Sequence, residues 1–215
     1  MPRVTDEHRA GRRAAILAAA ARIFAVKGFH GASMADLITE SGLSAGAVYS
    51  YFRSKEELIA AVADLAHATA DEVFREMLAD GATPSPADAV AMMIRAIHER
   101  LVDGPLPGVD VTRIGVQVWA EALRNPEVHD RARKVLTRLR GHCAEVARRW
   151  QAAGNLPPGA DPEQTGAAML SLLQGYVVQR LLAPPIDAAA YIEGVGHLLG
   201  SGDRSAVASL PTRGA

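Results

Sequence analysis

The segment MADLITESGLSAGAVYSYF restricts the fold of this chain more than any other feature. Ser33 stands directly before it, and Ser44 stands before its second half. A serine in front of a helix accepts a hydrogen bond from a free backbone N–H of the first turn. Between the halves lies Gly42, and glycine ends helices because it adopts positive φ without strain. The pattern therefore predicts two short helices, 34–40 and 45–52, joined by a tight turn, which is the arrangement of a helix-turn-helix.

Longer helices are predicted on both sides of this motif. Apolar residues recur at spacings of three and four over residues 9–27. A long helix is expected over about 55–78, because Ser54 and Glu57 have the spacing of a capping box. No alternating strand pattern of useful length occurs, so the fold class is expected to be all-α. Further helices, separated by loops rich in Pro and Gly, are expected at 87–101, 111–124, 126–153, 162–182 and 187–199.

This order of helices indicates two domains and a tail. Residues 9–55 are expected to form an N-terminal three-helix helix-turn-helix domain, called the head below, with its recognition helix at about 45–52. Residues 56–200 are expected to form a larger helical domain, called the body. The small and polar residues 201–215 are expected to form a disordered tail.

The composition is that of a folded protein in a reducing compartment. Of 215 residues, 49% are hydrophobic and 22% are charged, which argues against disorder. The one cysteine, Cys143, builds neither a disulfide framework nor a multi-cysteine zinc site, so a cytoplasmic location is expected. The N-terminus lacks the pattern of a secretory signal, and the apolar stretches are shorter than the ~20 residues of a membrane span.

The charge is distributed unevenly along the chain. The net charge is −1, but residues 1–55 carry eight Lys or Arg against four Asp or Glu, and the remainder carries 15 against 20. A basic head on an acidic body points to nucleic acid as the partner of the head.

The outward side of the second short helix is suited to DNA. It begins with the small residues Ala45, Gly46 and Ala47. Small side chains let the backbone come close to base edges in the major groove. Phosphate contacts are expected from the hydroxyl and ammonium groups that follow, those of Tyr49, Tyr51 and Lys55. The alternative is a three-helix core with a solvated polar edge.

The segment ILAAAARIFAVKGFHGASMADLITESGLSAGAVYSYFRSKEEL, residues 16–58, resembles the DNA-binding domain of the TetR family of transcriptional regulators. The Gly-Leu-Ser turn, the Tyr-x-Tyr-Phe motif and the Ser-Lys-Glu-Glu-Leu segment occur in the family's order and spacing. Tyr51 departs from the pattern, because the family often has His there, and Ile38 and Ser41 stand where it commonly has Ala. The resemblance implies DNA contacts by Ser33, Ser44, Ala45, Gly46, Ala47, Tyr49, Tyr51 and Lys55.

The helix expected at 162–182 is apolar around most of its circumference, which requires burial on more than one side. A second copy of the chain offers that surface, and the TetR-like arrangement implies a homodimer joined through the last two helices. The alternative is a helix buried within a monomer. The residues expected at the dimer interface are Leu170, Val177, Leu181, Tyr191, Val195 and Leu198.

The resemblance also implies a small-molecule pocket between the helices of the body, with apolar walls and a few polar groups. An ordinary helical core fits the same residues and is the alternative. The expected apolar walls are Phe74, Met92, Met93, Trp119 and Tyr176, and the expected polar groups are His67, Arg113, Gln117 and Gln174.

No catalytic, metal or cofactor site is expected. Asp64, His67 and Asp71 share a helix face but are interpreted as a solvated cluster, and His142 is not a partner for Cys143 because adjacent helix positions point apart.

The function predicted from these features is that of a ligand-responsive regulator. It is expected to repress transcription by binding a palindromic DNA operator as a homodimer, and to be released by a small molecule. One alternative is an activator or ligand-independent regulator with the same head. The other is an all-helical small-molecule-binding protein or enzyme.

Overall fold

Every regular element in the described part of the chain is a helix, so the all-α fold class is confirmed. The computed structural model describes residues 6–104 and 109–199, except for the side chains of Glu7 and residues 65–67. The expected tail, 201–215, therefore lies outside the described residues.

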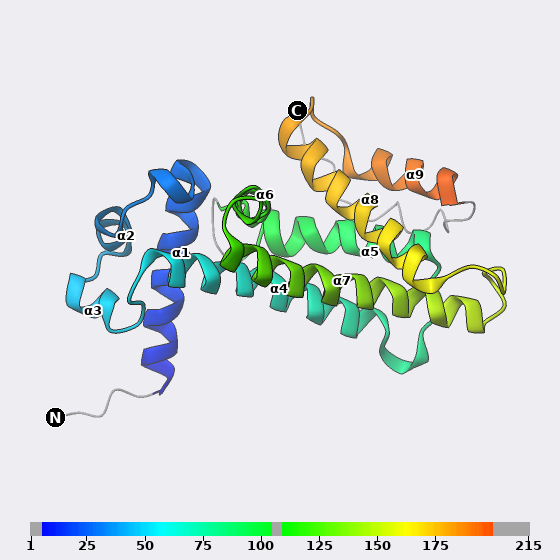
Figure 1. The fold of residues 1–215 in the computed structure, drawn as a ribbon, viewed down its shortest axis with the longest axis horizontal. Helices are drawn as coiled ribbons and strands as arrows, with labels where there is room; N and C mark the ends of the chain where they lie inside the picture. The colour runs from blue at the N-terminus through cyan, green and yellow to red at the C-terminus, as the bar shows by residue number, and fades with distance from the viewer. Residues whose placement is uncertain (1–5, 105–108, 200–215) are drawn as a thin grey trace.

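The head stands at one end of an elongated molecule (Figure 1). It contains α1 (Asp6–Gly31), α2 (Met34–Ser41) and α3 (Ala45–Tyr49). The helix α4 (Lys55–Met77) starts at the head and runs into the body along α7 (Figure 1). The remaining elements are η1 (Ala79–Gly81), α5 (Pro86–Ile97), the π-helical turn η2 (His98–Val102), α6 (Val111–Ala122), α7 (Pro126–Ala152), α8 (Pro162–Leu182) and α9 (Ala188–Leu199).

Side-chain caps set the starts of the short helices, as the sequence predicts. Ser33 Oγ accepts a hydrogen bond from the Asp36 backbone N–H at 3.1 Å, and the Asp36 carboxylate accepts one from the Ser33 N–H. The cap predicted at Ser54 also forms, with the Glu57 N–H donating at 3.2 Å. The predicted capping box there is only half formed, because the Glu57 carboxylate accepts from the Arg53 N–H instead.

Two helix ends differ from the prediction. Gly28 takes the expected positive φ of 70°, but helical hydrogen bonding resumes beyond it, so that α1 is kinked and ends at Gly31. The recognition helix is shorter than 45–52, because the backbone N–H groups of Tyr51 and Phe52 both donate to the carbonyl of Val48. This tight turn directs Phe52 into the core, where it is 2% exposed.

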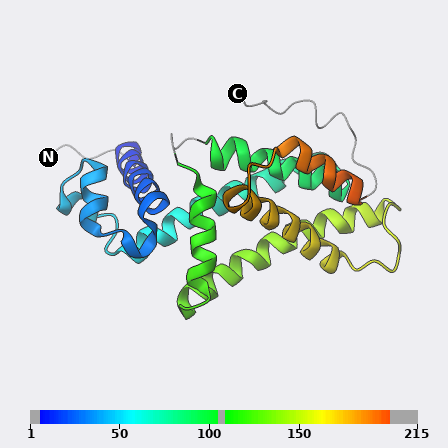
Figure 2. The ribbon, with the colours of Figure 1, turned by 90° about the horizontal axis from the view of Figure 1, so that it is seen from above.

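The described residues form two apolar cores, and one of them joins the two domains. The body core is built mainly from α4, α5, α8 and α9 around the fully buried Tyr176. The other core contains α1–α3 together with Leu58 and Val62 of α4 and with Val111 and Ile114 of α6. Figure 2 shows α6 between α1 and the rest of the body. The core of the head is therefore completed by residues of the body, and this second core is called the shared core below.

One segment, His8–Gly31, is long and apolar enough to cross a membrane by length and composition, although the sequence suggested none. It is most of α1. Its apolar side closes the shared core, with Phe24 and Phe29 in edge-to-face contact at 5.3 Å. Its other side is charged, so the segment has the polarity of a helix at the surface of a protein core.

Candidate DNA-binding surface and ligand cavity

The start of α3 presents the small surface that the sequence predicts. Ser44 caps the helix by accepting from the Ala47 N–H at 3.3 Å. Ala45 and Gly46 are exposed, and a Cβ added at Gly46 would meet nothing within 4 Å. Val48 anchors the opposite side at 0% exposure. The helix is therefore held from behind, and its outer side is open to a large partner.

The two predicted tyrosines lie in different environments. Tyr49 is 46% exposed, and no hydrogen bond to its hydroxyl is found among the described residues. Tyr51 is half-buried and packs against the shared core. Tyr49 is therefore free to contact a phosphate, whereas the ring of Tyr51 also contributes to the fold.

Ser33 and Lys55 are both engaged within the chain. The Ser33 hydroxyl donates to Asp36 Oδ2 at 2.7 Å, and Lys27 binds the same carboxylate at 2.6 Å. The Lys27 ammonium, followed by Ser33, lowers the pKa of Asp36 to about 2. Lys55 Nζ donates to the carbonyls of Phe29 at 2.8 Å and of Ala32 at 3.1 Å. Their phosphate contacts stay predictions. The cap formed by Ser33 was predicted from the sequence, whereas the structural role of Lys55 was not.

Further cations lie beside the recognition helix. Arg9, Arg12 and Arg13 are exposed on α1, and Arg53 is exposed just after α3. The Arg13 guanidinium lies 5.2 Å above the Phe52 ring, which places it at the end of the helix-turn-helix. These charges give the head surface the sign that a polyanion requires.

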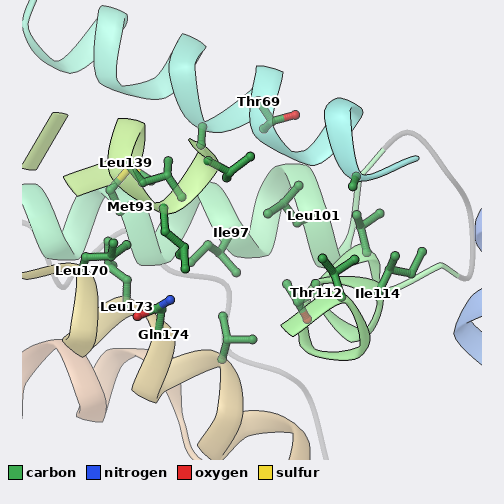
Figure 3. A pocket seen from close by; sticks show the side chains of 18 of the residues that line it. Thr69, Met93, Ile97, Leu101, Thr112, Ile114, Leu139, Leu170, Leu173 and Gln174 are labelled. Carbon is green, nitrogen blue, oxygen red and sulfur yellow. The ribbon is translucent and has the colours of Figure 1, made fainter. Parts of the chain in front are cut away.

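A cavity of about 160 Å³ lies in the body, lined by residues of α4, α5, α6, α7 and α8 (Figure 3). Its wall is apolar apart from Thr69, Thr112, Gln174 and the indole of Trp119. None of the described residues that line it is charged. Such a site suits a small, largely apolar molecule.

Four of the nine pocket residues predicted from the sequence line this cavity: Phe74, Met93, Trp119 and Gln174. Met92 is 39% exposed on the outer side of α5, and Arg113 is exposed beside Asp110. His67 lies on α4, but its side chain is outside the described residues.

Tyr176, predicted as a wall of the pocket, is instead the centre of the body core. Its hydroxyl is hydrogen-bonded to His98, and burial raises the pKa of Tyr176 to about 12. Its ring also packs against that of Tyr191, with 4.9 Å between the ring centroids. A neutral, fully buried phenol in this position is structural.

Sequence reasoning missed most of the aliphatic wall, including residues that it assigned to a dimer interface. Leu170 and Val177 are 7% and 8% exposed and line the cavity. Val195 is buried in its own domain, and Tyr191 donates from its hydroxyl to the Leu172 carbonyl. The apolar stripe of α8 therefore faces inward, because the same chain already covers it.

The outer faces of α8 and α9 are the surface left open in this region. Ala168, Ser171 and Leu182 are exposed on α8, Leu182 by 77%. Leu198 of α9 is 79% exposed, and the predicted interface residue Leu181 is half-buried. Small and apolar side chains are thus exposed on both helices, which suits these outer faces to helix packing.

A part-buried ion pair fixes the start of α6 to α8. Arg180 Nη2 lies 2.7 Å from Asp110 Oδ2 and also donates to the Thr112 hydroxyl. Asp110 is in turn the N-cap of α6, because its carboxylate accepts from the Thr112 N–H at 3.1 Å. Thr112 lines the cavity, so this network closes one end of it.

The second half of α6 contacts the head. Gln117, predicted as a pocket residue, donates from Nε2 to the Phe24 carbonyl at 3.1 Å, and its buried Oε1 has no partner among the described residues. His30 Nε2 lies 2.9 Å from Glu121 Oε2. A groove of about 500 Å³ runs beside these contacts and shares Ala63, Val118, Ala132 and Val135 with the cavity wall. The cavity and the head are thus separated by one helix.

Neither a metal site nor a reactive cysteine is found among the described residues. No group of three His, Cys, Asp or Glu side chains there could hold a metal ion. Asp71 is paired with His142 at 2.9 Å and with Arg138 at 3.3 Å. Cys143 is fully buried, and burial raises the pKa of its thiol to about 12.

The helix-turn-helix with its open, basic face on a helical body defines a DNA-binding transcriptional regulator. Residues 16–62 match the family model described as bacterial regulatory proteins, tetR family, and residues 90–201, more than half of the chain, match the model of the BetI-type transcriptional repressor, C-terminal. The chain belongs to the TetR family of transcriptional regulators. The class is that of regulators and not of enzymes.

Relatives and solved structures agree with this assignment over most of the chain. The chain is 26% identical over 188 residues to the HTH-type transcriptional regulator UidR of Escherichia coli strain K12, covering 87% of this chain and 91% of UidR. It is similar to the structure of Salmonella enterica GusR, with 25% identity, a TM-score of 0.70, and coverage of 92% and 99% of the two chains. AibR, solved in complex with isovaleryl coenzyme A and operator DNA, shares the fold, with 17% identity, a TM-score of 0.66 and coverage of 89% and 100%.

Proposed function

We propose that this regulator is a repressor, which binds a palindromic operator as a homodimer and leaves it when a small molecule occupies the cavity. The expected location is the cytoplasm, where the operator DNA is found. Repression is supported by the BetI-type repressor model that matches the body. The proposal is also supported by AibR, which shares the fold and was solved in complex with isovaleryl coenzyme A and operator DNA.

The observation that carries the proposal is that the cavity and the shared core have walls in common. Val62 of α4 and Val111 and Ile114 of α6 line the cavity and also pack in the core that contains the head. A ligand that displaces either helix therefore changes how the head is held. The ligand shifts the equilibrium only if it binds the DNA-free arrangement more tightly than the DNA-bound one.

Dimerisation is proposed through the outer faces of α8 and α9. Leu198 and Leu181 remain from the interface residues expected from the sequence, and Ala168, Ser171 and Leu182 are added. A dimer places two copies of α3 about one DNA turn apart, ~34–36 Å, which is the spacing needed to read a palindrome.

A gel-shift assay with the intergenic DNA beside the regulator's own gene tests the function. Specific binding by the dimer is expected, because the head presents α3 and its cations on one surface. A reporter under the bound promoter then separates repression from activation, since a repressor lowers expression. A folded dimer that binds no such DNA specifically contradicts the proposal.

A further inference from the structure

We infer that the part of the effector held in the cavity is uncharged, of about the size of one ring, and carries a single hydrogen-bonding group directed at Gln174. This inference rests on the proposed function, since it names the class of ligand that the cavity takes.

We infer that the bound part of the ligand is uncharged because the wall of the cavity carries no charged side chain among the described residues. Its described residues include no Asp, Glu, Lys, Arg or His. Arg180, which contacts the wall residue Thr112, does not line the cavity itself, and its guanidinium is paired with Asp110 at 2.7 Å. An ion that moves from water into a cavity with such a wall loses its hydration without gaining a partner. The free-energy cost of this transfer is far greater than that of burying a neutral polar group. Both carboxylates and ammonium groups are therefore selected against.

The size follows from the volume. The cavity measures about 160 Å³ and is lined by Val, Leu, Ile, Phe and Ala side chains from five helices. Apolar protein cavities of about 150 Å³ stay dry and take up benzene. A ring with one small substituent therefore fills the space, and burying it removes apolar surface from water.

Gln174 is the polar side chain of the wall that can both donate to and accept from such a ligand, whereas the Trp119 indole N–H can only donate. Thr112 is engaged by Asp110 and Arg180, and Thr69 also has a partner. For the Gln174 amide, no hydrogen bond is found within the part of the chain that the structure describes, and Figure 3 shows it next to Leu173 on the α8 side of the cavity. An amide both donates and accepts, so it matches a hydroxyl, a carbonyl or an amide of the ligand. One uncommitted amide in an apolar wall orients the ligand through one contact.

The test uses three probes that share one ring: toluene, benzyl alcohol and benzoate. Trp119 in the wall reports binding through its fluorescence, and Trp150→Phe removes the only other tryptophan. The titrations are run at pH 8. Toluene and benzyl alcohol are expected to bind, and benzoate and the cation benzylammonium are expected to bind at least tenfold more weakly. Equal binding of the ions and the alcohol overturns the inference.

Two pairs of variants locate the binding. Gly115 lines the cavity and Gly141 does not, and a Cβ at either meets nothing within 4 Å, so that at both positions an added side chain starts in open space. Gly115→Leu is expected to abolish probe binding and Gly141→Leu to leave it unchanged. In Gln174→Leu, benzyl alcohol is expected to lose about threefold to tenfold in affinity, since one neutral hydrogen bond is lost, and toluene is expected to lose none. Equal losses for the two probes contradict the role of Gln174.

These outcomes are independent of DNA binding. A protein that binds its operator but takes up benzoate as well as benzyl alcohol refutes only the ligand class. A protein that binds the neutral probes but no DNA refutes the proposed function and leaves the cavity assignment standing.

Discussion

Replacing Lys55 by Met separates the two roles of this side chain. Met keeps the length of the stem and removes the ammonium, which donates to the Phe29 carbonyl at 2.8 Å and to the Ala32 carbonyl at 3.1 Å. These bonds join the start of α4 to the end of α1 and the link that follows it. The predicted contact with a phosphate would use the same group. The variant is therefore expected to lose stability before any DNA is added.

The size of this loss of stability follows from the two hydrogen bonds that Lys55→Met removes. A bond from a charged donor contributes about 1.5–3 kcal/mol, and about 1 kcal/mol for each is reasonable for a half-buried group that water can partly reach. The free energy of unfolding is then expected to fall by about 2 kcal/mol. For a chain of this length, each kcal/mol shifts Tm by about 2–4 °C, so a decrease of about 4–8 °C is expected.

Thermal unfolding followed by circular dichroism measures this decrease. The matched control is Arg53→Met, because Arg53 is exposed two residues away and its guanidinium has no partner among the described residues. The control removes the same charge from the head and is expected to leave Tm unchanged. An unchanged Tm in Lys55→Met would refute the structural role.

DNA binding by Lys55→Met, measured well below its Tm, tests the phosphate contact. If the ammonium also contacts a phosphate, the slope of log K against log salt concentration becomes less negative by about 0.9. An unchanged slope together with a lower Tm leaves only the structural role.

Four further outcomes are expected. Tyr49→Phe weakens DNA binding for all sequences by about tenfold or less without changing Tm, because one exposed hydroxyl that contacts a phosphate is removed. Ser171→Arg yields monomers in light scattering, because it places a charge on the outer face of α8. In acid titrations, the stability advantage of the native protein over Asp36→Asn is present above pH about 4 and is lost as the pH falls towards 2, since the pKa of Asp36 is lowered to about 2 in the folded state. The Cys143 thiol does not react with Ellman's reagent at pH 8 until the chain is unfolded in urea, because it is buried with a pKa of about 12.

Each of these four predictions would be contradicted by a specific result. A lower Tm in Tyr49→Phe would show that the hydroxyl supports the fold. An unchanged dimer of Ser171→Arg would place the interface elsewhere. A stability difference for Asp36→Asn that persists at pH 2 would mean that ionisation of Asp36 is not its source. Rapid labelling of native Cys143 would show that α7 opens locally.

The sequence predicted the helices well because their ends depend on local chemistry. Ser33, Ser44 and Ser54 each cap the helix that was expected to follow, and Gly42 takes the left-handed φ of 65° that ends α2. Such signals act within one turn and need no tertiary information.

The direction in which an apolar helix faces could not be predicted in the same way. Leu170 and Val177 were expected at a dimer interface because α8 is apolar around most of its circumference. Which part of such a helix is covered by its own chain depends on α5, α6 and α7, far away in the sequence. The internal bonds of Lys55 escaped prediction for the same reason, since its acceptors lie 26 and 23 residues earlier.

The attachment of α6 at its two ends has a mechanical consequence. The Asp110–Arg180 pair provides a pivot at the start of the helix, Gln117 contacts Phe24 near its middle, and Glu121 contacts His30 of the head near its other end. At 1.5 Å per residue, the 12 residues of α6 form a lever arm about 18 Å long. Gly115 and Val118 face the cavity near the middle of this arm. An outward push there is about doubled at the end that carries Glu121, and a tilt of only about 5° moves that end by ~1.6 Å.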